Sequence, residues 1–116
     1  MSNSTFICSV NAIAPTSGRA ALVDGQQVAI FRVTTSAGEH FFALDNFCPF
    51  SQANVLSRGI VGSLKGKWVV ASPIYKQHFD LQTGICLEYP PVSVSTWPVT
   101  CEGDQLFIVN RKYAAA

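Results

Sequence analysis

Charged residues are scarce in this chain of 116 residues, at 13% of the sequence against about 25% in typical soluble domains. The formal net charge is only +1, which argues against a nucleic-acid-binding protein, because such proteins carry a basic stripe that neutralises phosphates. A surface with few charges can be covered by a stable partner at low desolvation cost. The scarcity therefore slightly favours a subunit of a complex, although small β domains are often charge-poor as well.

Long apolar runs are also missing. No stretch of about 18 apolar residues exists, so no membrane span is expected. Residues 1–5 lack the basic region and apolar core of a secretory signal. We therefore expect a cytoplasmic protein, whose thiols stay reduced. The cysteines are then not two disulfides, and the absence of a C-x-x-C pair argues against a zinc ribbon or a thioredoxin-type motif. They are Cys8, Cys48, Cys86 and Cys101.

Familiar catalytic patterns are absent too. The sequence has no glycine-rich phosphate loop, no Ser-His-Asp pattern and no H-E-x-x-H motif. Asp45 and Asp80 are not spaced as a pair of catalytic carboxylates. His40 and His78 lie beside phenylalanines at strand positions, and both are predicted to be solvated rather than metal ligands. These absences predict a chain without a catalytic site of its own.

Hydrophobic residues are plentiful, at 48%, which is enough for one small core. A length of 116 residues fits a single domain, with an ordered core over about residues 6–109 and a loose tail over residues 111–116. Gly and Asp/Asn turn signals recur between short runs rich in Val, Ile, Phe and Thr. This pattern is typical of an all-β sandwich or barrel.

Strands are predicted in the runs between these turn signals. No apolar period of 3.6 residues persists over ten residues or more, so long helices are not expected. Short helical turns are predicted at 10–14, before Pro15, and at 52–57. Val28 and Ile30 are expected to point inward, with Phe31 as a further candidate. The expected strands are 5–9, 19–24, 27–33, 39–44, 59–64, 67–72, 77–81, 92–100 and 105–110.

Two loops interrupt the predicted strands. The first reads N-F-C-P-F at residues 46–50, and the second reads S-P-I-Y-K at 72–76 before Q-H-F-D-L and a Q-T-G turn. These loops resemble the frame of a Rieske domain, which has Cys-x-His in one loop and Cys-x-x-His in the other. In that family a strand similar to Phe-Asp-Leu and a Thr-Gly turn follow the second loop. The resemblance implies a Rieske-like (ISP) fold of three small antiparallel sheets, with the two loops at its tip.

The resemblance also identifies the positions of the cluster ligands. A Rieske cluster is held by two thiolates and two imidazoles. Cys48 occupies the first thiolate position, and Ser72, whose hydroxyl is a poor substitute for a soft thiolate, occupies the second. Phe50 and Tyr75 occupy the imidazole positions, with a ring that has no lone pair and a phenol that titrates near pH ~10. Three of four ligands are therefore lost, and no iron–sulfur cluster or other metal is expected on this chain.

This loss, and much of the remaining sequence, is similar to the small subunits of bacterial NAD(P)H-dependent nitrite reductases. The resemblance runs from about Phe6 to Val109 and includes L-S-R-G at 56–59 and S-P-x-x-K-Q at 72–77. Members of that family often have aspartate where Cys48 stands. The resemblance implies a non-catalytic accessory subunit whose partner is the large subunit. That partner carries FAD, an iron–sulfur cluster and sirohaem, and reduces nitrite to ammonium with electrons from NADH.

Several alternatives stay open at this point. The chain is either an accessory subunit, a Rieske-type [2Fe–2S] electron carrier with unusual ligands, or a thiol-based module that uses Cys48. Phe50 and Tyr75 either pack together across the two loops or pack separately, each in its own loop. Docking uses the loop tip or a charge-poor sheet face, and Lys65 and Lys67 are expected to be solvated. The candidates for partner contact are Phe50, Arg58, Tyr75 and Lys76.

Overall fold

The computed structural model describes residues 4–110, and the predicted loose tail at 111–116 lies outside the described residues. Short strands and two single turns of 3-10 helix make up its regular structure. The strands are β1 (Ser4–Ser9), β2 (Ser17–Val23), β3 (Gln26–Thr35), β4 (Gly38–Asp45), β5 (Phe47–Cys48), β6 (Ala53–Asn54), β7 (Ile60–Leu64), β8 (Lys67–Ala71), β9 (His78–Asp80), β10 (Thr96–Trp97), β11 (Val99–Glu102) and β12 (Gln105–Val109). The helical turns are η1 (Val10–Ala12) and η2 (Leu56–Arg58).

The strands form small antiparallel sheets, as the all-β prediction required. The four-stranded sheet has the order β10-β4-β3-β2, and two three-stranded sheets have the orders β1-β12-β11 and β7-β8-β9. A two-stranded ribbon, β5-β6, adds to the three sheets that the resemblance implies. Within the described part of the chain, no helix is long and apolar enough to cross a membrane.

Strand β3 separates two hydrophobic cores. Val28 and Ile30 face the core that contains Leu106 of β12, and Phe31 faces the core that contains Phe79 of β9. Because successive side chains of a strand point to opposite sides, a strand covered on both sides must be apolar at nearly every position. This confirms the inward placement of Val28 and Ile30 and adds Phe31, whose side chain is on the other face. Gly18 is required beside it, because a Cβ there would lie 2.6 Å from the Phe31 ring.

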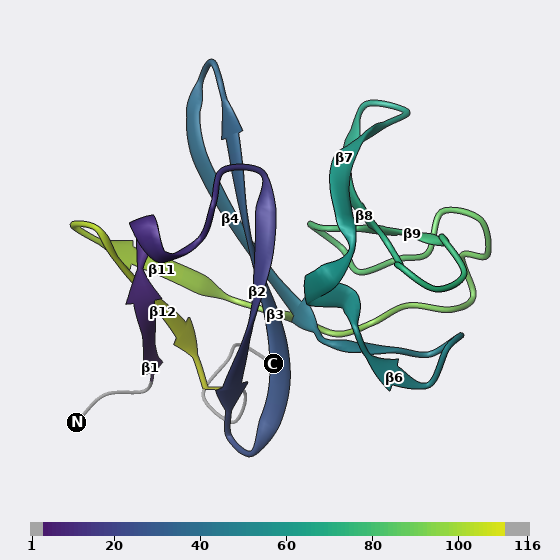
Figure 1. Ribbon diagram of the computed structural model, residues 1–116, viewed down its shortest axis with the longest axis horizontal. Coiled ribbons are helices and arrows are strands. Elements are labelled where there is room, and N and C mark those ends of the chain that lie inside the picture. The colour runs from purple at the N-terminus through teal and green to yellow at the C-terminus, as the bar shows by residue number, and fades with distance from the viewer. Residues whose placement is uncertain (1–3, 111–116) are drawn as a thin grey trace.

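The elements of the molecule are arranged in two halves (Figure 1). The half on the left of the view holds β1, β11, β12 and most of the long β2–β4 meander, and the right half holds β6 to β9 with the loops around them. Both ends of the described chain lie in the left half, where Ser4 pairs with Val109 and the Thr5 hydroxyl donates to Asn110 Oδ1 at 2.6 Å. We call this end the base. Neither end of the described chain, residues 4–110, lies among the loops of the right half.

The prediction of one strand over 92–100 was wrong. The chain instead pairs with β4 through β10 and with β12 through β11, and it changes sheets at Pro98. Proline has no N–H to donate to a ladder, which favours a break at this point. The Trp97 indole donates to Asp45 Oδ1 at 2.8 Å, and the Pro98 carbonyl accepts from Val109 N–H at 3.0 Å, so both sides of the break are fixed.

The first long loop is more ordered than the sequence suggested. Residues 47–54 form the β5–β6 hairpin, in which Phe47 pairs with Asn54. The helical turn predicted at 52–57 occurs later, as η2 over Leu56–Arg58. Gln52 has a φ of 57°, a left-handed conformation that suits the hairpin turn and does not continue a helix.

Candidate functional site

The two loops that carry the Rieske-like positions lie together in the right half of the molecule. We call residues 47–54 and 72–77 the tip. The first loop is the β5–β6 hairpin, closed by a bond from Gln52 N–H to the Cys48 carbonyl at 2.8 Å. The second is a turn closed at both ends by Ser72, whose N–H donates to Gln77 at 2.8 Å and whose carbonyl accepts from Lys76 at 3.0 Å. Lys76 adopts a φ of 63° to complete this turn.

Asn46 anchors the first loop to the β-sheet, and the sequence prediction missed this role. Its buried side chain accepts from Ser57 N–H at 2.7 Å through Oδ1 and donates to Gln27 Oε1 at 3.1 Å through Nδ2. Its carbonyl accepts from the N–H groups of Val55 and Leu56 at 3.0 and 3.1 Å. An asparagine at the end of a strand, where side-chain amides often hold turns, was the available signal.

Cys48 and Ser72, at the two thiolate positions, are in direct contact. The Cys48 thiol donates to Ser72 Oγ at 3.6 Å, and both residues are buried, with exposed fractions of 0% and 1%. The Ser72 hydroxyl also accepts from Ile74 N–H at 3.5 Å, so one side chain joins the loops and braces its own turn. The predicted pair of positions therefore does meet in space.

The environment of Cys48 favours its thiolate more than the sequence suggested. Burial raises the pKa of the Cys48 thiol, but hydrogen bonds from Ser51, Ser72 and the Phe50 backbone outweigh this effect and lower the pKa below its usual value of 9.0. No cation is needed for this shift.

Phe50 and Tyr75, at the two imidazole positions, do not pack together. The Phe50 ring is half-buried and lies 6.1 Å from the Phe79 ring, at an angle of 47°, against the core that holds Phe79. Tyr75 points to solvent and is 60% exposed. Packing of these rings across the loops is therefore not observed, because Phe50 finds a larger apolar surface beneath its own loop.

The residues at these four positions do not fit a Rieske cluster. Cys48 alone is a soft donor, whereas a phenyl ring cannot ligate iron, and the Tyr75 phenol is exposed while the Cys48 thiol is buried. The cysteines other than Cys48 do not complete the set among the described residues, where no group of three or more His, Cys, Asp or Glu side chains is arranged to hold a metal ion. The tip therefore offers packing and surface rather than ligands.

His78, which was predicted to be solvated, is half-buried and paired with Glu88. Its Nδ1 lies 2.6 Å from Glu88 Oε2, and its N–H donates to Glu88 Oε1 at 2.8 Å. Burial raises the pKa of the Glu88 carboxyl, but hydrogen bonds from the His78 backbone and ring outweigh this and lower it. The two residues join the second loop to a third segment, residues 85–93, which runs beside β9.

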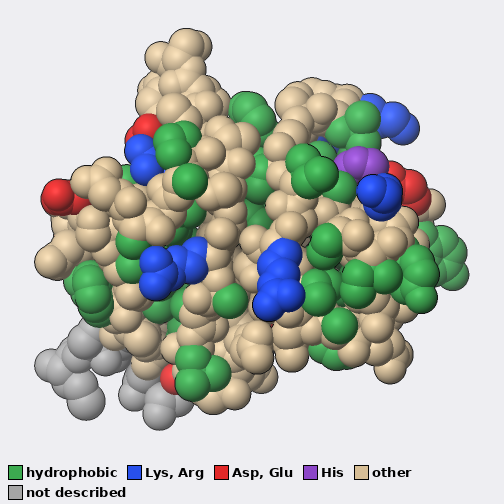
Figure 2. Space-filling view, in the orientation of Figure 1, with side chains coloured by type: hydrophobic (Ala, Val, Ile, Leu, Met, Phe, Trp, Pro, Cys, Tyr) green, Lys and Arg blue, Asp and Glu red, His purple; other side chains and the backbone are tan. Residues whose placement is uncertain are grey.

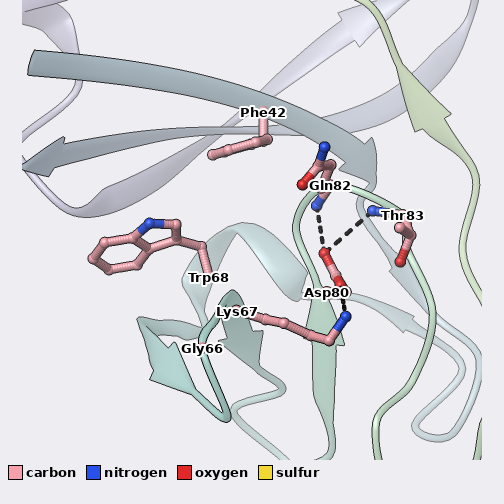
Figure 3. A pocket seen from close by; sticks show the side chains of 7 residues that line it. All are labelled: Phe42, Gly66, Lys67, Trp68, Asp80, Gln82 and Thr83. Atoms are coloured by element: carbon pink, nitrogen blue, oxygen red, sulfur yellow. Dashed lines mark hydrogen bonds and ion pairs between the residues drawn. The ribbon is translucent and has the colours of Figure 1, made fainter. Parts of the chain in front are cut away.

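A cavity of about 390 Å³ lies between Phe42 of β4 and the turn that follows β9 (Figure 3). Asp80 is buried beside it. Its Oδ1 accepts from the N–H groups of Gln82 and Thr83 at 2.8 and 3.3 Å, and its Oδ2 lies 3.6 Å from Lys67 Nζ. Lys67 is therefore paired rather than simply solvated. Because this carboxylate is fully engaged, we interpret Asp80 as a structural turn residue.

The surface of the tip is apolar and basic. Ile74 and Tyr75 are 48% and 60% exposed, and Lys76 beside them is exposed. Arg58, the remaining predicted contact residue, is exposed at the end of η2. Figure 2 shows hydrophobic side chains gathered on the right of the molecule, with cationic, histidine and acidic side chains above them. Of the predicted contact residues, Tyr75 and Lys76 are the most available to a partner, and Phe50 is the least.

Comparison with known proteins places these features in context. The family of Rieske-like [2Fe-2S] domains matches residues 3–109. The nitrite reductase (NADH) small subunit of Salmonella typhimurium is 45% identical over 94 residues, which cover 81% of this chain and 85% of that protein. A solved structure, the nitrite reductase [NAD(P)H] small subunit from Erwinia carotovora, superposes with a TM-score of 0.78 at 40% identity, covering 100% of this chain and 88% of the other.

One relative is much longer than this chain. The nitrite reductase [NAD(P)H] large subunit of Klebsiella oxytoca is 38% identical over 109 residues, which make up 94% of this chain but only 11% of that protein. A domain similar to this chain is therefore part of a far longer polypeptide in that relative.

Proposed function

This chain belongs to the family of Rieske-like [2Fe-2S] domains and, within it, to the small subunits of NADH nitrite reductases, and from this membership we propose that it is a cytoplasmic accessory subunit without a redox centre of its own. The redox centres, FAD, an iron–sulfur cluster and sirohaem, are then on a large subunit that reduces nitrite to ammonium. The small subunit binds that chain and is needed for its full activity.

This proposal rests on the side chains at the four ligand positions of the tip. Cys48 and Ser72 are in contact, so the loops keep two ligand positions together, yet only one of the two is a thiol. Phe50 contributes a ring that packs inward on Phe79, and Tyr75 contributes an exposed phenol. A cluster needs four suitable donors at one place. A subunit with this tip is expected to act by contact rather than by electron transfer.

The long relative supports a lasting partnership with the large subunit. In the Klebsiella oxytoca protein, a domain similar to 94% of this chain lies in the same polypeptide as the large subunit named for nitrite reduction. Covalent fusion keeps two domains at high effective concentration, which is useful when they work as one assembly. When the small and large subunits are separate chains, we expect them to associate non-covalently.

The proposal is tested by purifying this chain with and without its large subunit. We expect the isolated chain, prepared anaerobically, to be colourless and to contain no stoichiometric iron or sulfide. We expect the tagged chain to retain the large subunit when the two are co-expressed, and the large subunit alone to show reduced NADH–nitrite activity. Visible absorption with two irons per chain would favour the alternative, a Rieske-type carrier with unusual ligands. Full activity without this chain would contradict the accessory role.

A further inference from the structure

Three of the exposed apolar side chains of the right half belong to two neighbouring segments, whereas Ile60 of β7, at 74% exposed, lies outside them. Ile74 and Tyr75 of the second loop are 48% and 60% exposed, and Tyr89 of the third segment is 54% exposed. The third segment pairs with β9 in antiparallel register, with Phe79 opposite Cys86 and with Leu87 N–H donating to the His78 carbonyl at 2.8 Å. The third segment is thus held beside β9, the strand that directly follows the second loop.

The His78–Glu88 pair holds the two segments together. Glu88 immediately precedes Tyr89, and both of its oxygens are bound by His78, at 2.6 Å from the ring and 2.8 Å from the backbone N–H. The Tyr89 carbonyl accepts from Val92 N–H at 2.9 Å, which closes the turn on the other side of the tyrosine. Tyr75 and Tyr89 are thus on separately braced turns. Aromatic side chains presented on ordered turns lose little conformational entropy on binding.

The second loop is cationic. Lys76 is exposed beside Ile74 and Tyr75, and between Asp45 and Asp80 the chain has no carboxylate side chain. The nearest acidic group of the third segment, Glu88, is engaged by His78. Exposed tyrosines with a cationic rim fit an apolar surface with an acidic rim. A second copy of this chain is a poor occupant, because two such surfaces would bring like charges together.

The chain ends point to the same conclusion. Ser4 and Val109 are paired at the base, away from the tip and the third segment (Figure 1). A polypeptide fused to either end of the described chain would join the domain at the base. The surface that bears Tyr75 and Tyr89 then stays free for non-covalent contact with the rest of the large chain.

We propose that Ile74, Tyr75, Lys76 and Tyr89 form the docking surface for an acidic-rimmed apolar patch on the large nitrite reductase subunit. We call these residues the docking surface. This inference rests on the proposed accessory function and deepens it by naming the face and the character of the partner's surface. Tyr75 and Lys76 of this surface were among the contact residues predicted from the sequence. Tyr89 is an addition, from a segment outside the predicted strands, and Phe50 is set aside because its ring packs inward.

The test is a titration of the purified large subunit with the full chain and its variants. Tyr89→Ala and Tyr75→Ala are each expected to raise the Kd by about tenfold or more, as truncated aromatic anchors typically do. Lys76→Glu is expected to raise the Kd further at low salt than at high salt, because it reverses a rim charge. The matched control is Phe6→Ala, whose side chain is 53% exposed at the base against 54% for Tyr89, and its Kd is expected to change by less than about twofold.

The outcomes separate this inference from the function it rests on. If the unchanged chain does not bind the large subunit, both the accessory function and the assignment of the docking surface are overturned. If the unchanged chain binds but Tyr89→Ala, Tyr75→Ala and Lys76→Glu bind equally well, this surface alone is overturned. Loss of binding by Phe6→Ala with the tip variants unaffected would place docking at the base. Thermal unfolding of each variant checks that the fold is retained, which is expected because all four side chains are exposed.

Discussion

The Cys48 thiol lies 3.6 Å from the Ser72 hydroxyl, so the two residues at the thiolate positions of the Rieske frame touch. Two thiolates bound to one tetrahedral metal ion at about 2.3 Å each lie about 3.8 Å apart. The backbone of the two loops therefore still holds these side chains at the spacing of a shared metal ligand pair. Compared with a cluster-binding Rieske domain, the chemistry of the donor side chains differs here, whereas the path of the backbone does not.

Ser72→Cys should create a pair of thiols that oxidises readily. The introduced sulfur would take the place of the Ser72 hydroxyl beside Cys48, within reach of a disulfide after small side-chain rotations. After mild oxidation, peptide mapping should find the segment with position 48 linked to the segment with position 72. Ser63→Cys, which adds an equivalent thiol at an exposed position of β7, is the control and should stay unlinked. Two unlinked thiols in the Ser72 variant would mean that the loops are farther apart than described.

Phe50→Ala and Tyr75→Ala should have very different effects on stability. Phe50 loses its contact with Phe79 and leaves a gap above the core, so we expect the free energy of unfolding to fall by about 2 kcal/mol. Tyr75 is 60% exposed, and its truncation should change that free energy by less than about 0.5 kcal/mol. Urea denaturation measures both values. Equal losses would indicate that the two rings support each other after all.

Hydrogen exchange gives a second view of the Phe50 variant. The Gln52 amide closes the β5–β6 hairpin and should exchange faster in Phe50→Ala, whereas amides in the centre of β3 should be unaffected. Unchanged exchange at Gln52 would show that the hairpin is ordered without the Phe50 ring.

Much of the fold was predictable because it depends on local patterns. Alternating apolar residues and Gly or Asp turns located most strands. Because proline has no N–H to donate to a ladder, Pro98 would have predicted the break between β10 and β11. The loss of ligands at Phe50, Ser72 and Tyr75 was readable as well, since it follows from side-chain chemistry at aligned positions.

The remaining features depend on contacts between distant residues. Phe50 packs on Phe79 rather than Tyr75 because the sheet brings an apolar surface beneath its loop, which no local pattern encodes. His78 pairs with Glu88, ten positions away, only because an irregular segment lies beside β9. Periodicity describes which face of a strand a side chain occupies, and it does not say what covers that face.

Acid should weaken the link between the second loop and the third segment. Burial raises the pKa of Glu88, but hydrogen bonds from His78 outweigh this and lower it below its usual value of 4.5. A carboxyl whose pKa is lowered in the folded state stabilises the fold above its unfolded pKa, and this stabilisation is lost as pH falls through the folded pKa. The free energy of unfolding should therefore fall more for the unchanged chain than for Glu88→Gln between about pH 5 and pH 3.

Urea denaturation at a series of pH values measures this difference. Glu102→Gln, which removes an exposed carboxylate on β11 in the other half of the molecule, is the control and should keep the acid-dependent loss of the unchanged chain. If Glu88→Gln and the unchanged chain lose stability in parallel, the His78–Glu88 contact contributes nothing to folding.

Asn46 should be the most sensitive polar residue of the first loop. Asn46→Ala removes the acceptor of the Ser57 N–H and the donor to Gln27 Oε1, which are two part-buried hydrogen bonds. A hydrogen bond contributes about 0.5–1.5 kcal/mol, so we expect the free energy of unfolding to fall by about 1–3 kcal/mol. The exposed Asn54→Ala is the control and should cost less than about 0.5 kcal/mol.

The position of Asn46 also makes its loss visible beyond stability. Its carbonyl still accepts from Val55 and Leu56, so η2 should persist, but the side-chain link between the sheet at Gln27 and the end of the loop at Ser57 would be broken. We expect the amide of Ser57 to exchange faster in Asn46→Ala while the β7–β8 amides keep their rates. A variant that is destabilised with uniform exchange would mean that Asn46 supports the whole fold rather than this loop, because a local anchor must release its own segment first.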